Sequence, residues 1–325
     1  MPTDLSCHQI GLLLLIDRLR QRNCSLGRSE LLAFAEIKLP GVARDYDTLF
    51  TWLLEYSLAS GTPEIFALTQ AGELLVDEVA GQYSLHAWFY DEYYQAVLNS
   101  RAHARFCERV YGIDLCQHGM NDLPQLKLML RALQVTPGMA LLEFGCGDGR
   151  IAEYIAVMEQ VHVTGVDIAA HAIALAQGRT QSRRGRLSFT CADVDRGTGN
   201  FPTGLFDRIL AIDSIFFVGN MRKALDLLAS HLKPGGMIGL TYHFPANLSP
   251  EQSALGVVLG ELGLPYTTVD LTAQNIAHWQ LKKQVLSEMQ EEFEQEGSAF
   301  LFKNRLAECQ GWDTLRRSLF ISRKT

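Results

Sequence analysis

The stretch Met139–Arg150, MALLEFGCGDGR, decides the fold of this 325-residue chain. An apolar, strand-like run ends at Glu143, and three glycines follow at alternate positions, Gly145, Gly147 and Gly149. The next residues, 151–158, carry apolar side chains at helical spacing. A strand, a glycine-rich turn and a helix in this order let the backbone lie against a ligand, with the free N–H groups of the helix start facing it.

A second strand-like run, 161–166, ends in Asp167. A carboxylate at the tip of the second strand, about 20 residues beyond a glycine turn, is the group that binds ribose hydroxyls in folds of this kind. The glycine spacing differs from the G-x-G-x-x-G of dinucleotide-binding turns, because the third glycine comes two residues after the second. Glu143 at the strand end would repel a pyrophosphate and attract an ammonium or sulfonium group. An NAD-binding or nucleotide-free α/β domain is the alternative that this chemistry disfavours.

The glycine stretch resembles the first motif, E/D-x-G-x-G-x-G, of the class I S-adenosylmethionine-dependent methyltransferases. Four further blocks resemble that family in its order, VTGVDIA (163–169), CADVDR (191–196), FDRILAIDSIFFV (206–218) and LKPGGMIGL (232–240). The resemblance implies an α/β fold with a doubly wound, Rossmann-like, seven-stranded sheet, whose antiparallel seventh strand is SLFIS (318–322). It also implies S-adenosyl-L-methionine as cofactor and no metal.

The same resemblance assigns roles to residues of these motifs. Glu143 is expected near the cofactor loop, Asp167 on the ribose hydroxyls and Ile168 on the adenine face. Asp193 and Val194 are expected at the adenine edge. The remaining cofactor-binding candidates lie in the loop, at the end of strand four and before the first strand: Gln117, Gly145, Cys146, Gly147, Gly149, Asp213 and Ser214. Cys146 is interpreted as a small filler of the loop and not as a nucleophile.

A general base would help a hydroxyl acceptor, whereas an amine needs only to be deprotonated before it attacks. The catalytic candidates are the polar residues at expected pocket-facing ends, His118, Asp213, Tyr242 and His243. A surface position for His118, and a strand-end pair with one buried side chain for Tyr242 and His243, are at least as compatible with the sequence. The N/D-P-P-Y/F motif of amino-methylating DNA enzymes is absent, because Asp213-Ser214-Ile215-Phe216 stands at that position.

Residues 1–82 are expected to form a separate helical module. Helices are predicted over 5–23, 29–36, 47–58 and 70–79, with a short strand at 63–68, an order that resembles a winged helix. Residues 1–80 contain six Lys and Arg against eleven Asp and Glu, and the third helix has no Lys or Arg. DNA reading requires a basic recognition helix, so dimerisation and partial covering of the active site are the favoured roles.

The rest of the chain divides into a linker with lid helices, 83–122, and a methyltransferase domain, 123–325. Aromatic residues crowd the linker and are expected mainly to pack between the domains. A helical insertion, 272–309, lies between strands six and seven and is acidic in its middle. It is expected to cover the substrate pocket, with Trp279, Phe293, Phe300 and Phe302 serving mostly as anchors.

Composition sets outer limits on function. The net charge of −7 argues against a broad nucleic-acid surface. Seven scattered cysteines without a CxxC pair are typical of a reducing cytoplasm rather than of disulfides or a zinc site. The apolar run 12–16 is too short to span a membrane.

The sequence therefore predicts methyl transfer to N or O of a small molecule by a cytoplasmic homodimer that contacts neither nucleic acid nor membrane. The alternatives are a cofactor-sensing winged-helix regulator without catalysis and a protein or RNA methyltransferase.

Overall fold

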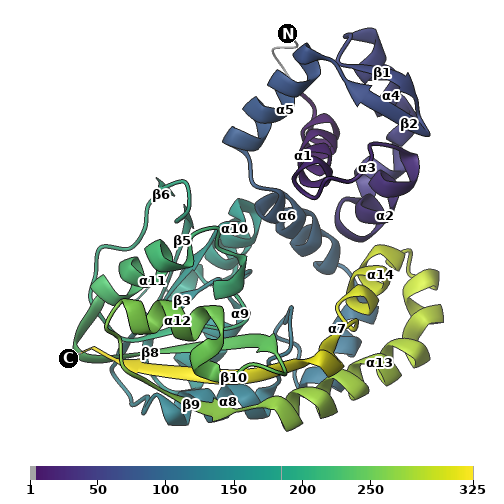
Figure 1. The fold of residues 1–325 in the computed structure, drawn as a ribbon. Helices are drawn as coiled ribbons and strands as arrows, with labels where there is room; N and C mark the ends of the chain where they lie inside the picture. The colour runs from purple at the N-terminus through teal and green to yellow at the C-terminus, as the bar shows by residue number, and fades with distance from the viewer. Residues whose placement is uncertain (1–4, 184, 325) are drawn as a thin grey trace.

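The computed structural model describes residues 5–183 and 185–324. Figure 1 shows three parts: an N-terminal module, a sheet with helices on both faces, and a group of helices that flanks the sheet and contains α6, the helix that joins the other two parts. None of the helices in these ranges combines the length and apolar character needed to cross a bilayer.

The N-terminal module has its own apolar core. Its elements are α1 (Cys7–Gln21), α2 (Arg28–Lys38), α3 (Pro40–Arg44), α4 (Tyr46–Glu55), β1 (Ala59–Thr62), β2 (Ile65–Leu68) and α5 (Gln70–Gln82). Ser6 and Gln9 form a capping box that starts α1, and the apolar run 12–16 is buried in the core of the module. The strand predicted over 63–68 is β2, which pairs with β1 in an antiparallel hairpin. β1 and α3 were not predicted from the sequence. The winged-helix assignment stays a prediction.

The central sheet is mixed. Its strands are β3 (Ala140–Phe144), β4 (His162–Asp167), β5 (Leu187–Asp193), β6 (Thr198–Gly199), β7 (Phe206–Ala211), β8 (Leu232–Pro245), β9 (Tyr266–Asp270) and β10 (Leu315–Arg323). Their spatial order is β6-β5-β4-β3-β7-β8-β10-β9. β10, predicted over 318–322, is antiparallel to both of its neighbours, as expected. The sheet has one strand more than predicted because the two-residue β6 pairs with the end of β5.

Helices cover both faces of this sheet, because successive strand residues point to opposite sides. Leu141 of β3 packs in one apolar cluster with α8 (Leu123–Ala132), α9 (Arg150–Met158) and α10 (Ala170–Arg179). Leu142, the next residue, packs in another cluster with α11 (Met221–Ser230) and α12 (Ala254–Glu261). The glycine turn thus leads from the middle of the sheet into α9.

A third group of helices lies beside the sheet and is called the cover below, although no residue of the insertion 272–309 lines the cavity of the candidate site. It consists of α6 (Leu85–Val97), α7 (Arg101–Tyr111), α13 (Thr272–Gln295) and α14 (Ala299–Ala307), which share one apolar cluster. Figure 1 shows α13 and α14, in yellow-green, running along the flank of the molecule toward the N-terminal module. Trp279, Phe293, Phe300 and Phe302 all pack in this cluster, which agrees with their expected role as anchors. Short 3-10 helices complete the fold, η1 (Gln181–Arg183), η2 (Ile215–Phe217), η3 (Pro250–Gln252) and η4 (Trp312–Thr314).

Candidate functional site

A cavity of about 510 Å³ lies at the carboxyl ends of the central parallel strands. This is the edge where open α/β sheets bind ligands, and the volume is in the range of small-molecule sites. The strand tips contribute Phe144, Gly145, Asp167, Ile168, Asp193, Val194, Asp213 and Ser214; α6 contributes Tyr90 and Tyr94, and the loop before α8 contributes His118. Residues far apart in the sequence therefore meet around one cavity.

The glycine turn lies so close to its neighbours that side chains would not fit there. A Cβ on Gly145 would come 2.3 Å from Ser214, and a Cβ on Gly147 would come 1.8 Å from the Tyr94 hydroxyl oxygen. Both glycines also have positive φ angles, +77° and +54°. Gly145 lines the cavity, whereas Gly147 is covered by Tyr94. Gly149 caps the start of α9 and does not line the cavity.

Asp167, at the tip of β4, connects the glycine turn to the cavity. Its Oδ2 accepts a hydrogen bond from Gly147 N at 2.7 Å, and its Oδ1 accepts one from Ala169 N at 2.9 Å. Each carboxylate oxygen can accept a second bond, so both remain able to bind a hydroxyl in the cavity. Burial raises the pKa of the Asp167 carboxyl, while these backbone N–H groups lower it.

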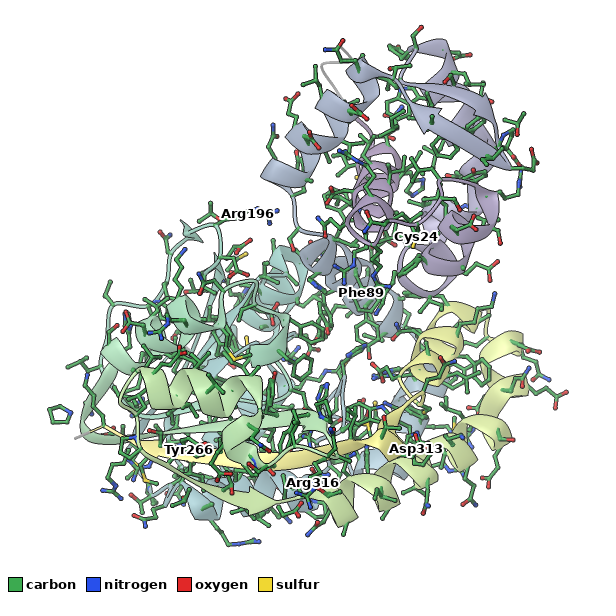
Figure 2. All side chains as sticks on the ribbon, in the orientation of Figure 1. Cys24, Phe89, Arg196, Tyr266, Asp313 and Arg316 are labelled. Carbon is green, nitrogen blue, oxygen red and sulfur yellow. The ribbon has the colours of Figure 1, made fainter. Side chains whose placement is uncertain are left out.

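The tip of β5 supplies the other expected acid, Asp193. Its Oδ1 accepts from the backbone N–H groups of Asp195 and Arg196, at 3.0 and 3.1 Å. Its Oδ2 lies 3.0 Å from Nη1 of Arg196. Arg196 also lines the cavity and was not predicted, because its further contacts come from the N-terminal module and leave no local signal in the sequence. Figure 2 shows Arg196 on the side of the sheet domain that faces the module.

Glu143 does not line the cavity. It shares a strand face with Leu141, so its side chain points toward α9 and lies beneath the glycine turn. It is 1% exposed, and its Oε2 has no hydrogen-bond partner within residues 5–183 and 185–324. Burial and the nearby carboxylates of Asp167 and Asp148 raise the pKa of Glu143 well above its usual range.

Cys146 also lies outside the cavity, buried against Gly165. Burial raises the pKa of its thiol well above the usual value, which disfavours the nucleophilic thiolate. This agrees with its interpretation as a filler of the loop. All seven cysteines of the chain carry free thiols.

Asp213 lines the cavity but is fully engaged. It forms a buried ion pair with Arg317, and its Oδ2 accepts from Met120 N at 2.9 Å. Burial alone would raise the pKa of Asp213, but the Arg317 guanidinium outweighs burial and holds it below the usual value. Such a carboxylate stays charged at neutral pH and is a weak base, so the geometry favours a structural role over the catalytic one. Ser214 lines the cavity, and its Oγ donates to Phe144 O at 2.5 Å.

His118 faces the cavity from the loop before α8. Its Nε2 lies 2.6 Å from Oε1 of Glu308, and its Nδ1 lies 3.5 Å from the hydroxyl oxygen of Tyr90. Burial lowers the pKa of His118, although Glu308 opposes that shift. The neighbouring Gln117 does not line the cavity; its Oε1 accepts from Leu115 N at 2.9 Å and shapes the loop.

Tyr242 and His243 lie outside the cavity. They were expected at a strand end, but β8 continues past both to Pro245 because it pairs with β10 along this length. His243 packs between Phe216 and Trp312, with ring centroids 4.4 and 4.9 Å away. The cavity therefore brings together His118 and Asp213 but neither Tyr242 nor His243.

The cover residues that line the cavity were expected only as packing rings or were not considered. His86, Tyr90 and Tyr94 are spaced by four residues, which places them on one face of α6. That spacing is visible in the sequence and could have identified them as lining residues. Glu308, whose carboxylate lies beside His118, could not have been found this way, because it is almost two hundred residues from His118 along the chain.

Comparison with known proteins places the glycine turn and the strand tips in a family. Residues 141–236 match the model of the family described as methyltransferase domain. An O-methyltransferase from Pyrenophora dematioidea is 32% identical over 34% of this chain and 42% of its own length. Phosphoethanolamine N-methyltransferase 1 from Arabidopsis thaliana is 30% identical over 40% of this chain and 26% of its own length. The chain thus spans less than half the length of these relatives.

Solved structures share the fold. Phosphoethanolamine N-methyltransferase 2 from Haemonchus contortus, in complex with S-adenosyl-L-methionine, superposes with a TM-score of 0.51 and 19% identity, covering 72% of this chain and 60% of that one. The motif order, the mixed sheet and the family match agree with one another. Residues 141–236 therefore form a methyltransferase domain of the class I S-adenosylmethionine-dependent type.

Proposed function

We propose that this protein transfers the methyl group of S-adenosyl-L-methionine to an N or O atom of a small-molecule acceptor. The observation that carries this proposal is the composition of the cavity, with two acids at neighbouring strand tips, Asp167 and Asp193, and three polar rings, Tyr90, Tyr94 and His118. The relatives named above, an O-methyltransferase and an N-methyltransferase of phosphoethanolamine, support this reaction class.

The residues present fit S-adenosyl-L-methionine. Asp167 has spare acceptor capacity where ribose hydroxyls would bind, and Ile168 and Val194 offer apolar surface for the adenine ring. Gly145 lines the cavity with bare backbone, as the amino-acid part of the cofactor would require. When bound, the cofactor supplies an electrophilic methyl group on a positive sulfur, and the protein has to align the acceptor with it and exclude water.

A small acceptor suits the cover. Tyr90 and Tyr94 close the cavity from α6, and His118 closes it from the loop before α8. The N-terminal module adds Gln21, and contacts α14 through the ion pair of Glu36 with Lys303, at 2.7 Å. These contacts support a covering role for the module. Its α4 has no Lys or Arg, which disfavours DNA reading. Homodimerisation of the module is a further part of the proposal, and light scattering of the purified chain tests it.

Two measurements test the function. Calorimetry should show binding of S-adenosyl-L-methionine to the wild type, loss of binding in Asp167→Ala and unchanged binding in Asp226→Ala, an exposed acid on α11. Methyl-labelled cofactor added to a metabolite extract should then label a small product. Absence of binding by the wild type would overturn the proposal. Binding without any labelled product would favour a cofactor sensor instead.

A further inference from the structure

A buried charged cluster stands directly behind His118. It consists of Glu308 together with His118, Lys282 and Arg305, and we name it the Glu308 cluster. The side chains of Lys282 and Arg305 are 0% exposed. Lys282 Nζ forms an ion pair with Glu308 Oε2, and Arg305 Nη1 lies 3.2 Å from the same oxygen. The other oxygen, Oε1, lies 2.6 Å from His118 Nε2. One carboxylate oxygen thus pairs with two cations, and the other, which has no hydrogen-bond partner among the described residues, lies against the imidazole.

This arrangement fixes which ring nitrogen of His118 carries the proton. The lone pair of a nitrogen 2.6 Å from an anionic carboxylate oxygen would be repelled, so Nε2, the nitrogen that faces Glu308, has to carry the proton. The hydrogen bond of this N–H goes to Asn304 Oδ1, an acceptor 3.2 Å from Nε2. In the neutral ring the lone pair therefore lies on Nδ1, which is directed toward the Tyr90 hydroxyl at 3.5 Å and, like that hydroxyl, borders the cavity. The lone pair of His118 therefore lies on the side of the ring that borders the cavity, beside the Tyr90 hydroxyl.

We propose that Glu308 is the positioning residue of the reaction: it holds His118 as the Nε2–H tautomer, so that Nδ1 removes the proton of a hydroxyl acceptor. This inference rests on the proposed function and names its acceptor class. As the acceptor oxygen bonds to the methyl carbon, the sulfur–methyl bond breaks with its electron pair left on sulfur. The hydroxyl proton moves to Nδ1, and the resulting imidazolium later releases it to solvent.

The charges around His118 keep it neutral and ready to accept a proton. The titratable groups that face it come from α2, α6, α7, the sheet edge, α13 and α14, and they are Lys38, Tyr90, Tyr93, His103, Asp213, Lys282, Arg305 and Glu308. Burial, Arg305 and Lys38 disfavour the imidazolium, and Glu308 favours it. Glu308 thus acts on His118 through both its charge and its position beside Nε2. An amine in its free-base form would not need such a base, so the arrangement fits a hydroxyl.

Nitrogen-15 NMR of the full-length wild type tests the tautomer without any acceptor. The His118 resonances are assigned by their loss in His118→Gln. The expected spectrum at pH 7 shows a protonated Nε2 and an unprotonated Nδ1. A protonated Nδ1 would overturn the proposal, whether or not the protein transfers methyl groups. The failure of this inference is therefore distinguishable from the failure of the proposed function, which the absence of labelled product would indicate.

Glu308→Gln tests whether the carboxylate acts through His118. Because its negative charge favours the imidazolium, its removal should lower the His118 pKa and mix the two tautomers in the spectrum. Transfer of methyl label to the metabolite extract should fall about 10-fold or more, and the acid limb of its pH profile should move to lower pH. The matched control is Glu292→Gln. Glu292 lies in α13 and pairs with Arg105 at the surface, so this variant should leave both the rate of methyl transfer and its pH profile unchanged.

Glu308→Gln leaves two buried cations without their partner and can lose stability for that reason. The double variant Lys282→Met and Glu308→Gln removes one of these cations and provides a second test of the same point. If Glu308 had only a structural role, both variants would be less stable than the wild type, but the His118 tautomer, the His118 pKa and the acid limb of the pH profile would not change. That result would overturn the positioning role.

Discussion

The guanidinium of Arg196 lies 3.0 Å from the carboxylate of Asp193 at the tip of β5. The same guanidinium donates to Ala80 O at 2.8 Å and to Tyr83 O at 2.6 Å. These carbonyls belong to the end of α5 and the segment that leads into α6, and Figure 2 shows Arg196 reaching in that direction. One side chain thus connects the expected adenine edge of the site to the N-terminal module.

Arg196→Ala should loosen the module without unfolding the sheet. The pair is partly exposed, so the free energy of unfolding should change by at most about 1 kcal/mol. Limited proteolysis should cut the segment 80–84 faster than in the wild type, because two of its carbonyls lose their donor. Arg131→Ala, an exposed arginine on α8, is the control. Equal cleavage rates in the two variants would show that Arg196 does not tie the module to the sheet.

Gly147→Ala should test the contact between the glycine turn and the cover. A Cβ at this position meets the Tyr94 hydroxyl, and the positive φ adds a backbone cost of about 1–2 kcal/mol. Gly138 also has a positive φ, +84°, but a Cβ there has nothing within 4 Å. Gly138→Ala should therefore show the backbone cost alone, and Gly147→Ala should be the less stable variant in urea denaturation. Adding Tyr94→Phe should recover part of the difference.

Glu143→Gln should change the pH dependence of stability. The pKa of Glu143 is raised in the folded protein, so the folded state is disfavoured as pH rises above the unfolded value of 4.5. The loss of folding free energy grows by about 1.4 kcal/mol per pH unit until the pH passes the raised pKa of the folded state. Below the pKa of the unfolded state there is no such loss. Relative to the wild type, the variant should therefore gain stability between pH 5 and pH 8. Glu55→Gln, on the exposed face of α4, is the control, and a pH-independent difference for Glu143→Gln would contradict the prediction.

The sheet and its ligand edge were predictable from the sequence because their signals are local. The glycine turn and Asp167 follow from short patterns in which neighbouring residues determine the backbone. The antiparallel direction of β10 came from the family resemblance and agrees with the structure. The acids at the tips of β4 and β5 line the cavity because parallel strands end at the same edge.

The rest of the site depends on partners that are distant in the sequence. Glu143 has the carboxylate expected near the cofactor loop, but the side of the sheet that it faces depends on the register of β3, which no local pattern reveals. The side chains of His243 and Tyr242 were expected at a strand end, and the pairing with β10 extended that strand beyond them. Glu308 and Arg317 act on His118 and Asp213 only because the cover and the last strand fold back onto the sheet.

Asp213→Asn should be strongly destabilising, because it leaves the fully buried Arg317 without its partner. The loss of one member of a buried pair costs about 3–5 kcal/mol, whereas the exposed pair of Arg222 and Glu261 should cost at most about 1 kcal/mol when Arg222→Met breaks it. The double variant Asp213→Asn and Arg317→Met should recover much of the loss, since no uncompensated charge then remains buried.

The pH dependence separates this ion pair from a simple packing effect. The pKa of Asp213 is lowered in the folded state, so its contribution is complete above the unfolded value of 3.8 and is lost as pH falls through the lower folded value. The destabilisation caused by Asp213→Asn should therefore be constant from pH 5 to pH 8 and narrow only below about pH 4. Urea denaturation across this range measures it. A loss of stability that persists unchanged in strong acid would mean that packing, and not the charge of Asp213, holds Arg317 beneath the cavity.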